Sequence, residues 1–87
     1  MNNPQTTAAL VQAEVFRAEM VHPHWPSDII HQAAIVAEES GELVRAAVNI
    51  EYENADISAA ITEATHTAAT ACRMLDALIT LQKELNQ

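Results

Sequence analysis

Two short stretches of the chain each place metal-binding side chains three residues apart. They are residues 38–42 (Glu-Glu-Ser-Gly-Glu) and residues 63–66 (Glu-Ala-Thr-His). In a helix, residues three apart point from the same side, so each stretch presents a pair of polar groups together. The residues around both stretches are mostly alanine, valine, isoleucine, leucine and threonine. Carboxylates held near apolar surface need a cation, a proton or a salt bridge, and we interpret the two pairs as a divalent-metal site.

The chemistry that such a site supports is that of hard divalent cations. Mg²⁺ and Mn²⁺ prefer oxygen ligands, and enzymes that act on nucleotide phosphates hold them with a few carboxylates, water and substrate oxygens. One pair of such residues would be weak evidence. Two pairs, separated by a turn that makes their helices antiparallel, supply ligands from two rigid supports and predict the site more strongly.

The first of three predicted helices precedes both stretches. It runs from about Pro4 to Met20, with Asn3 as its cap and Pro4 at its first position. It ends before residues 22–26 (His-Pro-His-Trp-Pro), because two prolines remove backbone donors and disfavour helix before them. Its candidate core positions are Leu10, Val11, Val15 and Phe16.

The second and third predicted helices carry the two stretches. The second begins at Ser27 and Asp28, which act as its cap, and reaches about Ile50. The polar residues 51–56 indicate a turn. Within that turn, Asn54 or Asp56 would cap a third helix that continues to about Leu85.

Both long helices are apolar over most of their circumference. On the second helix the main stripe is Ile30, Ala33, Ala34, Ala37, Gly41, Val44 and Val48, with a further group at Ile35, Val36, Leu43, Ala46, Ala47 and Ile50. On the third the main stripe is Ile57, Ile61, Ala64, Ala68, Cys72, Leu75 and Ile79, and another side holds Ala59, Glu63, His66, Thr70 and Ala77. Such helices are predicted to be buried on most sides. Three helices cannot bury this surface unaided, so we expect a dimer that completes a four-helix-bundle core.

The composition fits a single small all-α domain over residues 1–87. The chain is 49% hydrophobic but has three aromatic residues and one glycine, a balance typical of alanine-rich helices. A formal charge of −8 argues against nucleic-acid binding. The lone cysteine, Cys72, is expected to be a small buried hydrophobe. No signal peptide is recognised and no apolar run nears the roughly 18 residues of a membrane span, so a soluble cytoplasmic protein is expected.

These stretches resemble a known family. Residues 38–42 followed by residues 63–66 resemble the EExxE…ExxD signature of the MazG-like all-α nucleoside triphosphate pyrophosphohydrolases. Residues 35–46 (IVAEESGELVRA) are similar to the family's "EEvGElarA" helix. Residues 63–78 (EATHTAATACRMLDAL) are similar to a phage-type branch with "ELxQvAAvAxrwLeAL". The resemblance covers roughly residues 25–78, most of the chain.

The resemblance implies an activity and an assembly. The activity is Mg²⁺-dependent hydrolysis of a (deoxy)nucleoside triphosphate to the monophosphate and pyrophosphate, by attack of water between the α and β phosphates. The assembly is a homodimer or a dimer of dimers. Carried over by position, Glu39, Glu42 and Glu63 would be metal ligands, and Glu38 would orient the attacking water or support the ligands.

His66 departs from the family pattern, which has aspartate at this position. A neutral imidazole removes one negative charge and is a poor ligand for Mg²⁺, better suited to Mn²⁺, Fe²⁺ or Zn²⁺. Three consequences stay open: a changed metal preference, a contact from His66 to phosphate, or an activity that is weakened or lost.

Each of these residues also has a simpler interpretation. Residues 38, 39 and 42 would be ordinary surface charges, with Arg45 paired to Glu42, and Glu63 would be solvated. His66 would be a structural histidine in a helix interface. Arg73 is either a phosphate clamp or a surface residue, and Trp25 either stacks on a nucleobase or packs in a core or interface. His22 and His24 are expected to be turn residues without a ligand role.

Three functions from different classes therefore compete. The leading hypothesis is the nucleotide pyrophosphohydrolase. A di-iron carboxylate protein would use the same Glu and Glu-x-x-His pairs, but only a dimer would supply enough of them. The third hypothesis is a catalytically weakened or inactive relative that binds a nucleotide or a protein. The histidine at position 66 and the presence of only four Lys and Arg residues favour that third hypothesis.

Overall fold

The computed structural model describes residues 4–87 and consists of three helices with no strand in that range. They are α1 (Pro4–Val21), α2 (Ile29–Glu53) and α3 (Ser58–Leu85). The predicted all-α class and the number of helices are confirmed. The cap predicted at Asn3 lies outside the described residues.

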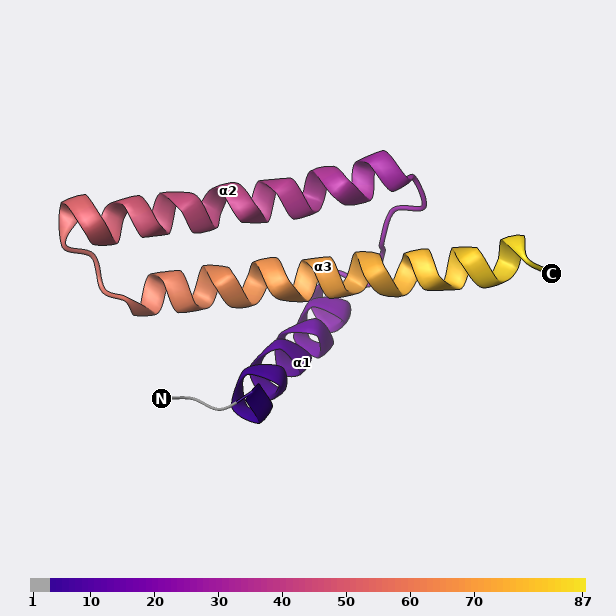
Figure 1. Ribbon diagram of the computed structural model, residues 1–87, viewed down its shortest axis with the longest axis horizontal. Coiled ribbons are helices and arrows are strands. Elements are labelled where there is room, and N and C mark those ends of the chain that lie inside the picture. Colours follow the sequence, from indigo (N-terminus) through magenta and orange to yellow (C-terminus); the bar gives the residue numbers. More distant parts are fainter. Residues whose placement is uncertain (1–3) are drawn as a thin grey trace.

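The helix α3 is the centre of the arrangement (Figure 1). The helices α2 and α3 run antiparallel and side by side, whereas α1 packs across α3 and makes no such contact with α2. The C-terminal end of α3 extends beyond α2, so the molecule is elongated, 52 × 28 × 22 Å. This arrangement places residues of α1 and α2 on either side of the middle of α3.

The connection between α1 and α2 is short and held at both ends. Asp28 caps α2, because its carboxylate accepts hydrogen bonds from the backbone N–H groups of Ile30 and His31, each at 3.3 Å. The buried side chain of Gln32 donates a hydrogen bond to the carbonyl of Pro26 at 2.9 Å. The predicted break at the two prolines is confirmed, with Asp28 as the capping residue.

The turn between α2 and α3 is shorter than predicted, because α2 continues to Glu53. Asn54 then ends α2 in the left-handed conformation, with a φ of 57° that asparagine tolerates better than most residues. Ile57 is the N-cap of α3 and makes no side-chain cap bond, so neither predicted residue holds that position. Asp56, one residue earlier, still supports the start of α3, because its carboxylate accepts a hydrogen bond from the backbone N–H of Ser58 at 2.8 Å. Asn54 instead ends the preceding helix.

The main stripes predicted to be buried are exposed in the single chain. Of the described apolar residues only Ala46 and Ala69 are buried, and Ile61, Val44 and Leu75 are 54%, 59% and 58% exposed. Phe16, a predicted core residue of α1, is 69% exposed, and Cys72 is exposed as well. The reason is geometric. The helix α2 packs against α3 alone and turns its second apolar group toward α3, so its main stripe faces outward.

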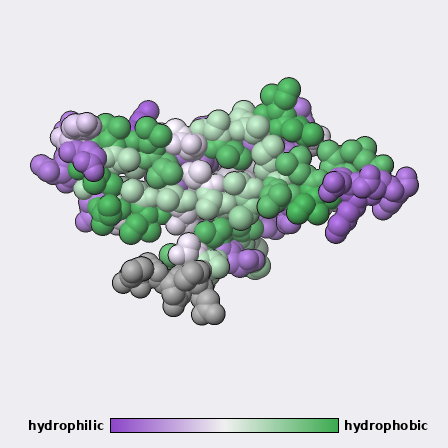
Figure 2. Space-filling model, in the orientation of Figure 1, coloured by the Kyte–Doolittle hydropathy of each residue, from purple (hydrophilic) through white to green (hydrophobic). Residues whose placement is uncertain are grey.

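The hydrophobic surface left uncovered is extensive. Figure 2 shows hydrophobic side chains spread over much of the face formed by α2 and α3. Within the described residues, no helix combines the length and the hydropathy that crossing a membrane requires.

Candidate metal centre

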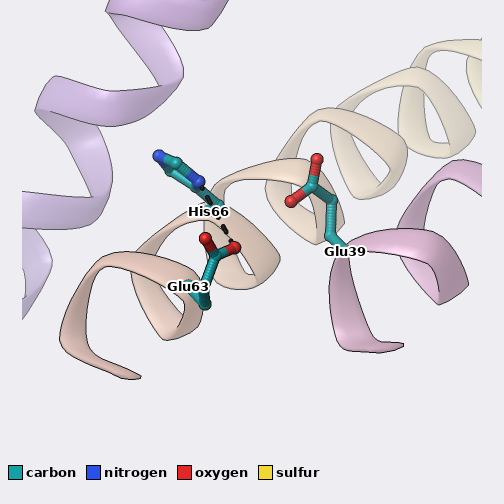
Figure 3. Close-up of side chains that lie close together, drawn as sticks. All are labelled: Glu39, Glu63 and His66. Atoms are coloured by element: carbon teal, nitrogen blue, oxygen red, sulfur yellow. Dashed lines mark ion pairs between the residues drawn. The ribbon is translucent and has the colours of Figure 1, made fainter. Parts of the chain in front are cut away.

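Three potential ligands meet where α2 faces the middle of α3. Glu39 comes from α2, and Glu63 and His66 come from α3, three residues apart. One ligand atom from each residue lies within 4.8 Å of the others (Figure 3). The predicted convergence of the two stretches is thus present for these three side chains.

Threonine hydroxyls surround this place on α3, and one of them contacts α2. The hydroxyl of Thr67 donates to the carbonyl of Glu63 at 2.8 Å and also lies 3.2 Å from the carbonyl of Glu39, across the helix interface. The hydroxyl of Thr70 donates to the carbonyl of His66 at 2.8 Å. In a helix, such bonds to the carbonyl four residues earlier keep small polar groups satisfied without occupying the space that a neighbouring helix needs.

Two carboxylate oxygens at this centre are buried without a hydrogen-bond partner. They are Oε2 of Glu39 and Oε2 of Glu63. Burial raises the pKa of Glu39 above its ordinary value, and the charges of Glu42, Glu63 and Glu38 add to the rise against the opposing influence of His66. A cation placed between the two carboxylates would offset both the desolvation and the repulsion.

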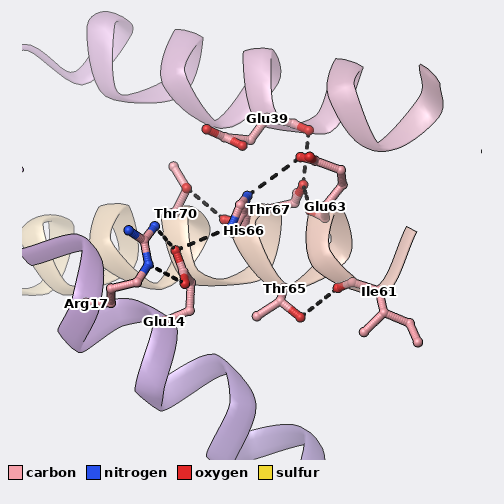
Figure 4. Close-up of polar contacts among 9 residues, drawn as sticks. All are labelled: Glu14, Arg17, Glu39, Ile61, Glu63, Thr65, His66, Thr67 and Thr70. Atoms are coloured by element: carbon pink, nitrogen blue, oxygen red, sulfur yellow. Dashed lines mark hydrogen bonds and ion pairs between the residues drawn. The ribbon is translucent and has the colours of Figure 1, made fainter. Parts of the chain in front are cut away.

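The helix α1 also reaches this centre. His66 lies between two carboxylates, one from α3 and one from α1 (Figure 4). Its Nδ1 is 3.7 Å from Oε2 of Glu63, and its Nε2 is 3.6 Å from Oε2 of Glu14 on α1. Arg17 holds Glu14 with two hydrogen bonds, at 2.8 and 2.6 Å. Those bonds keep the pKa of Glu14 below its ordinary value, so Glu14 is a carboxylate that already has a cationic partner.

These side chains line one cavity of about 370 Å³. All three helices contribute to its wall, as does the α1–α2 connection through His22 and Trp25. Arg73 of α3 also lines the cavity, with its guanidinium 4.8 Å from the centre of the Trp25 ring. Arg73 donates a hydrogen bond to the carbonyl of His22 at 2.8 Å. The cavity therefore combines carboxylates, an imidazole, two guanidinium groups and an indole.

The remaining predicted site residues divide into two groups. Glu42, Trp25 and Arg73 line this cavity, although Glu42 is exposed and does not belong to the three-ligand group. Glu38 is exposed and lies outside the cavity wall, and Arg45 lines a neighbouring cavity of about 410 Å³. Glu42 and Glu63 take part in both walls, so they separate the two cavities.

Sequence reasoning missed three residues of the centre. Glu14 and Arg17 have the i, i+3 spacing of a helical ion pair, which identifies the pair but not its neighbours on α3. Thr67 gave no signal beyond its position beside His66. Only the packing of α1 against α3 brings Glu14 to the imidazole.

The donor set fits a divalent cation of intermediate hardness. Two carboxylates and one imidazole, with two unpartnered carboxylate oxygens, suit Mn²⁺, Fe²⁺ or Zn²⁺ better than Mg²⁺, which favours all-oxygen surroundings. Glu39, Glu63 and His66 would hold the ion. Comparisons with protein-family models, with curated proteins and with solved structures find no match to this chain.

Proposed function

We propose that the chain hydrolyses a (deoxy)nucleoside triphosphate to the monophosphate and pyrophosphate at this centre. The observation that carries the proposal is the pair of buried, unpartnered oxygens of Glu39 and Glu63 beside His66. A divalent cation bound there would neutralise phosphate charge and polarise the phosphoryl group that water attacks. The resemblance of residues 38–42 and 63–66 to the MazG-like signature supports the choice of substrate.

The cationic side chains of the cavity suit the phosphates of such a substrate. Arg73, on the α3 side, lines the same cavity as the carboxylates, and so does Arg17 on the α1 side, although two of its donors are bound to Glu14. Guanidinium groups bind phosphate oxygens in a planar, two-pronged geometry. Arg73 uses one donor for the carbonyl of His22 and keeps others for a ligand, and its guanidinium lies over the Trp25 ring.

A second candidate function is a helical module that binds a nucleotide or a protein without hydrolysing it. The specific observations in its favour are the imidazole among the ligands, the exposure of Glu38, and the position of Glu42 outside the three-ligand group. A catalytic site would need a carboxylate that orients water, and Glu38 does not line the cavity.

A pyrophosphate-release assay tests the proposal. The protein is incubated with each of the common nucleoside and deoxynucleoside triphosphates, with Mg²⁺ or Mn²⁺, and pyrophosphate and monophosphate are measured together. We expect equal amounts of both products from at least one nucleotide, faster with Mn²⁺ than with Mg²⁺ because of His66. Glu63→Gln should abolish product formation, since it removes one ligand charge.

The controls separate the two candidate functions. Glu51→Gln removes an exposed carboxylate of α2 outside both cavities and should leave the rate unchanged. Binding of Mn²⁺ and nucleotide without any product would favour the binding module. A visible absorption band after aerobic loading with iron would favour the di-iron alternative.

The proposal includes a second copy of the chain. In the part of the chain whose side chains are described, fourteen large hydrophobic residues are exposed, and they include members of both main stripes on α2 and α3. A monomer rarely exposes a continuous apolar surface of this kind (Figure 2). Packing of α2 and α3 against the same helices of a partner would give the four-helix core that one chain lacks, and pairing of two dimers is the larger alternative.

A further inference from the structure

The contact between α1 and His66 bears on which nitrogen of the imidazole could bind a metal ion. A neutral imidazole carries its proton on one nitrogen and offers the lone pair of the other, so only one nitrogen can bind a metal ion. In this chain a carboxylate faces each nitrogen, with Glu63 toward Nδ1 and Glu14 toward Nε2 (Figure 4). The two carboxylates differ in their other partners.

Glu14 pairs with the permanently charged Arg17, whereas the ion pair of Glu63 in the described part of the chain is with His66, which is a cation only when protonated. Both oxygens of Glu14 accept hydrogen bonds from Arg17, and its side chain is 14% exposed. Oε2 of Glu63 is buried and accepts no hydrogen bond, and Oε2 of Glu39 is in the same condition. The place where a cation is needed is thus the Nδ1 side of His66.

We infer that Glu14 positions His66, by holding the imidazole proton on Nε2 so that the lone pair of Nδ1 points toward Glu63 and Glu39. The inference rests on the metal site of the proposed function and assigns a new role to α1. Histidines that bind metals commonly donate their other N–H to a carboxylate, which fixes the tautomer and the ring orientation. The 3.6 Å between Nε2 and Oε2 is longer than a hydrogen bond, and a small rotation of either side chain would close it.

The arrangement also explains why a histidine can replace the carboxylate that the family signature has at position 66. An aspartate has no ring N–H whose position must be fixed, and so it needs no hydrogen-bond acceptor on α1. A histidine in its place requires a second acceptor on its far side, and the Glu14–Arg17 pair supplies one whose charge is already balanced.

Two measurements test the inference, and the first needs no metal. Nitrogen NMR of the metal-free protein reports how the proton of His66 is divided between Nε2 and Nδ1. Because Glu63 faces Nδ1 and competes for this proton, the wild type should show both tautomers. Glu14→Leu, which removes the acceptor on the Nε2 side but keeps a side chain of similar size, should lower the population with the proton on Nε2. Equal populations in the wild type and Glu14→Leu would overturn the inference.

The second measurement is Mn²⁺ affinity by calorimetry. Glu14→Leu should weaken Mn²⁺ binding by roughly tenfold to a hundredfold, as loss of such an outer carboxylate does elsewhere, and Glu14→Gln, which keeps an acceptor oxygen, should fall between. In a His66→Asp background the same Glu14→Leu change should have no effect, because Glu14 acts through the imidazole. Glu19→Gln, an exposed carboxylate of the same helix that does not line the cavity, should bind like the wild type.

The outcomes distinguish a failure of this inference from a failure of the proposed function. Equal Mn²⁺ affinity in the wild type and Glu14→Leu would overturn the role of Glu14 while leaving the metal site intact. If Glu14→Leu weakens Mn²⁺ binding equally in the wild-type and His66→Asp backgrounds, Glu14 acts through folding or overall charge. That result would also overturn the inference. If the wild type binds no Mn²⁺, the metal site fails and the NMR result alone decides the tautomer.

Discussion

Glu39 carries its charge in unfavourable surroundings, which is typical of functional residues. One of its oxygens is buried without a hydrogen bond, and burial together with the neighbouring carboxylates raises its pKa. Groups with this combination cluster at binding and catalytic sites, since a fold gains no stability from them. If Glu39 binds a metal ion as proposed, the same residue links that binding to the stability of the metal-free chain.

Glu39→Gln separates these two properties. We expect the variant to lose Mn²⁺ binding and to have a higher free energy of unfolding than the wild type without metal at pH 7, because an amide has no charge to desolvate. In the wild type, Mn²⁺ should raise the thermal midpoint, as any ligand of the folded state does. Urea denaturation and thermal melts with and without Mn²⁺ measure both effects. A Glu39→Gln protein still stabilised by Mn²⁺ would contradict the ligand assignment.

The higher free energy of unfolding expected for Glu39→Gln without metal should depend on pH with a definite sign. Since the pKa of Glu39 is raised above its ordinary 4.5, the folded chain binds the proton more tightly than the unfolded chain does. The stability that protonation of Glu39 provides is fully present below about pH 4.5 and is lost as the pH rises through the raised pKa. The advantage of Glu39→Gln over the wild type should therefore be small in acid, grow above that pH and become constant near neutrality.

The helix α1 depends on few contacts for its position. It packs against α3 alone, and the chain that follows it is fixed by Arg73, which bonds the carbonyl of His22 and covers the ring of Trp25. Gln32 fixes the same connection at Pro26. Because α1 carries Glu14 and Arg17, these few polar contacts help to set the geometry of the candidate metal centre.

Arg73→Lys tests this dependence with the charge preserved. Lysine cannot stack a planar group on Trp25 or reproduce the guanidinium geometry, so we expect a loss of about 1 kcal/mol in the free energy of unfolding. Amide hydrogen exchange in α1 should become faster, while exchange in the middle of α2 stays the same. Arg45→Lys, an exposed arginine of α2, is the matched control and should change neither. Equal exchange in α1 for both variants would show that α1 is held by other contacts.

The molecule as a whole has too little buried apolar surface for a chain of its hydrophobicity. Ala46 and Ala69 are the only buried apolar residues in the described part, while isoleucines, valines and leucines of α2 and α3 face outward. A single small core of this kind rarely supplies enough free energy for a stable fold. Association of two copies through α2 and α3 would remove this surface from water.

Ile61→Glu tests the association. Ile61 is 54% exposed, so in a monomer the change should alter the free energy of unfolding by about 0.5 kcal/mol or less. In a dimer it would place a charge within the interface. The dissociation constant of the dimer should then rise at least about tenfold, which corresponds to about 1.4 kcal/mol. Sedimentation equilibrium over a range of concentrations measures this. Gln12→Glu, an exposed position on α1, is the control, and equal behaviour of both variants would exclude this face as the interface.

The helices and part of the candidate metal centre were predictable because their signals are local. Prolines at residues 23 and 26, the carboxylate of Asp28 and that of Asp56 act within a few residues, so helix positions follow from the sequence. The closeness of Glu63 and His66 follows from the helical repeat. The end of α2 was placed three residues early, because Asn54 stops the helix by its left-handed conformation and the polar residues before it remain helical.

Which faces meet depended on packing between distant residues. Both long helices are apolar on more than one side, so periodicity did not distinguish the side that contacts the neighbouring helix from the side that stays exposed. The same holds for α1, whose rotation about its axis brings Glu14 to His66 and leaves Phe16 outside. Helix rotation and crossing are fixed by contacts between residues far apart in the chain, and a short sequence pattern carries no record of them.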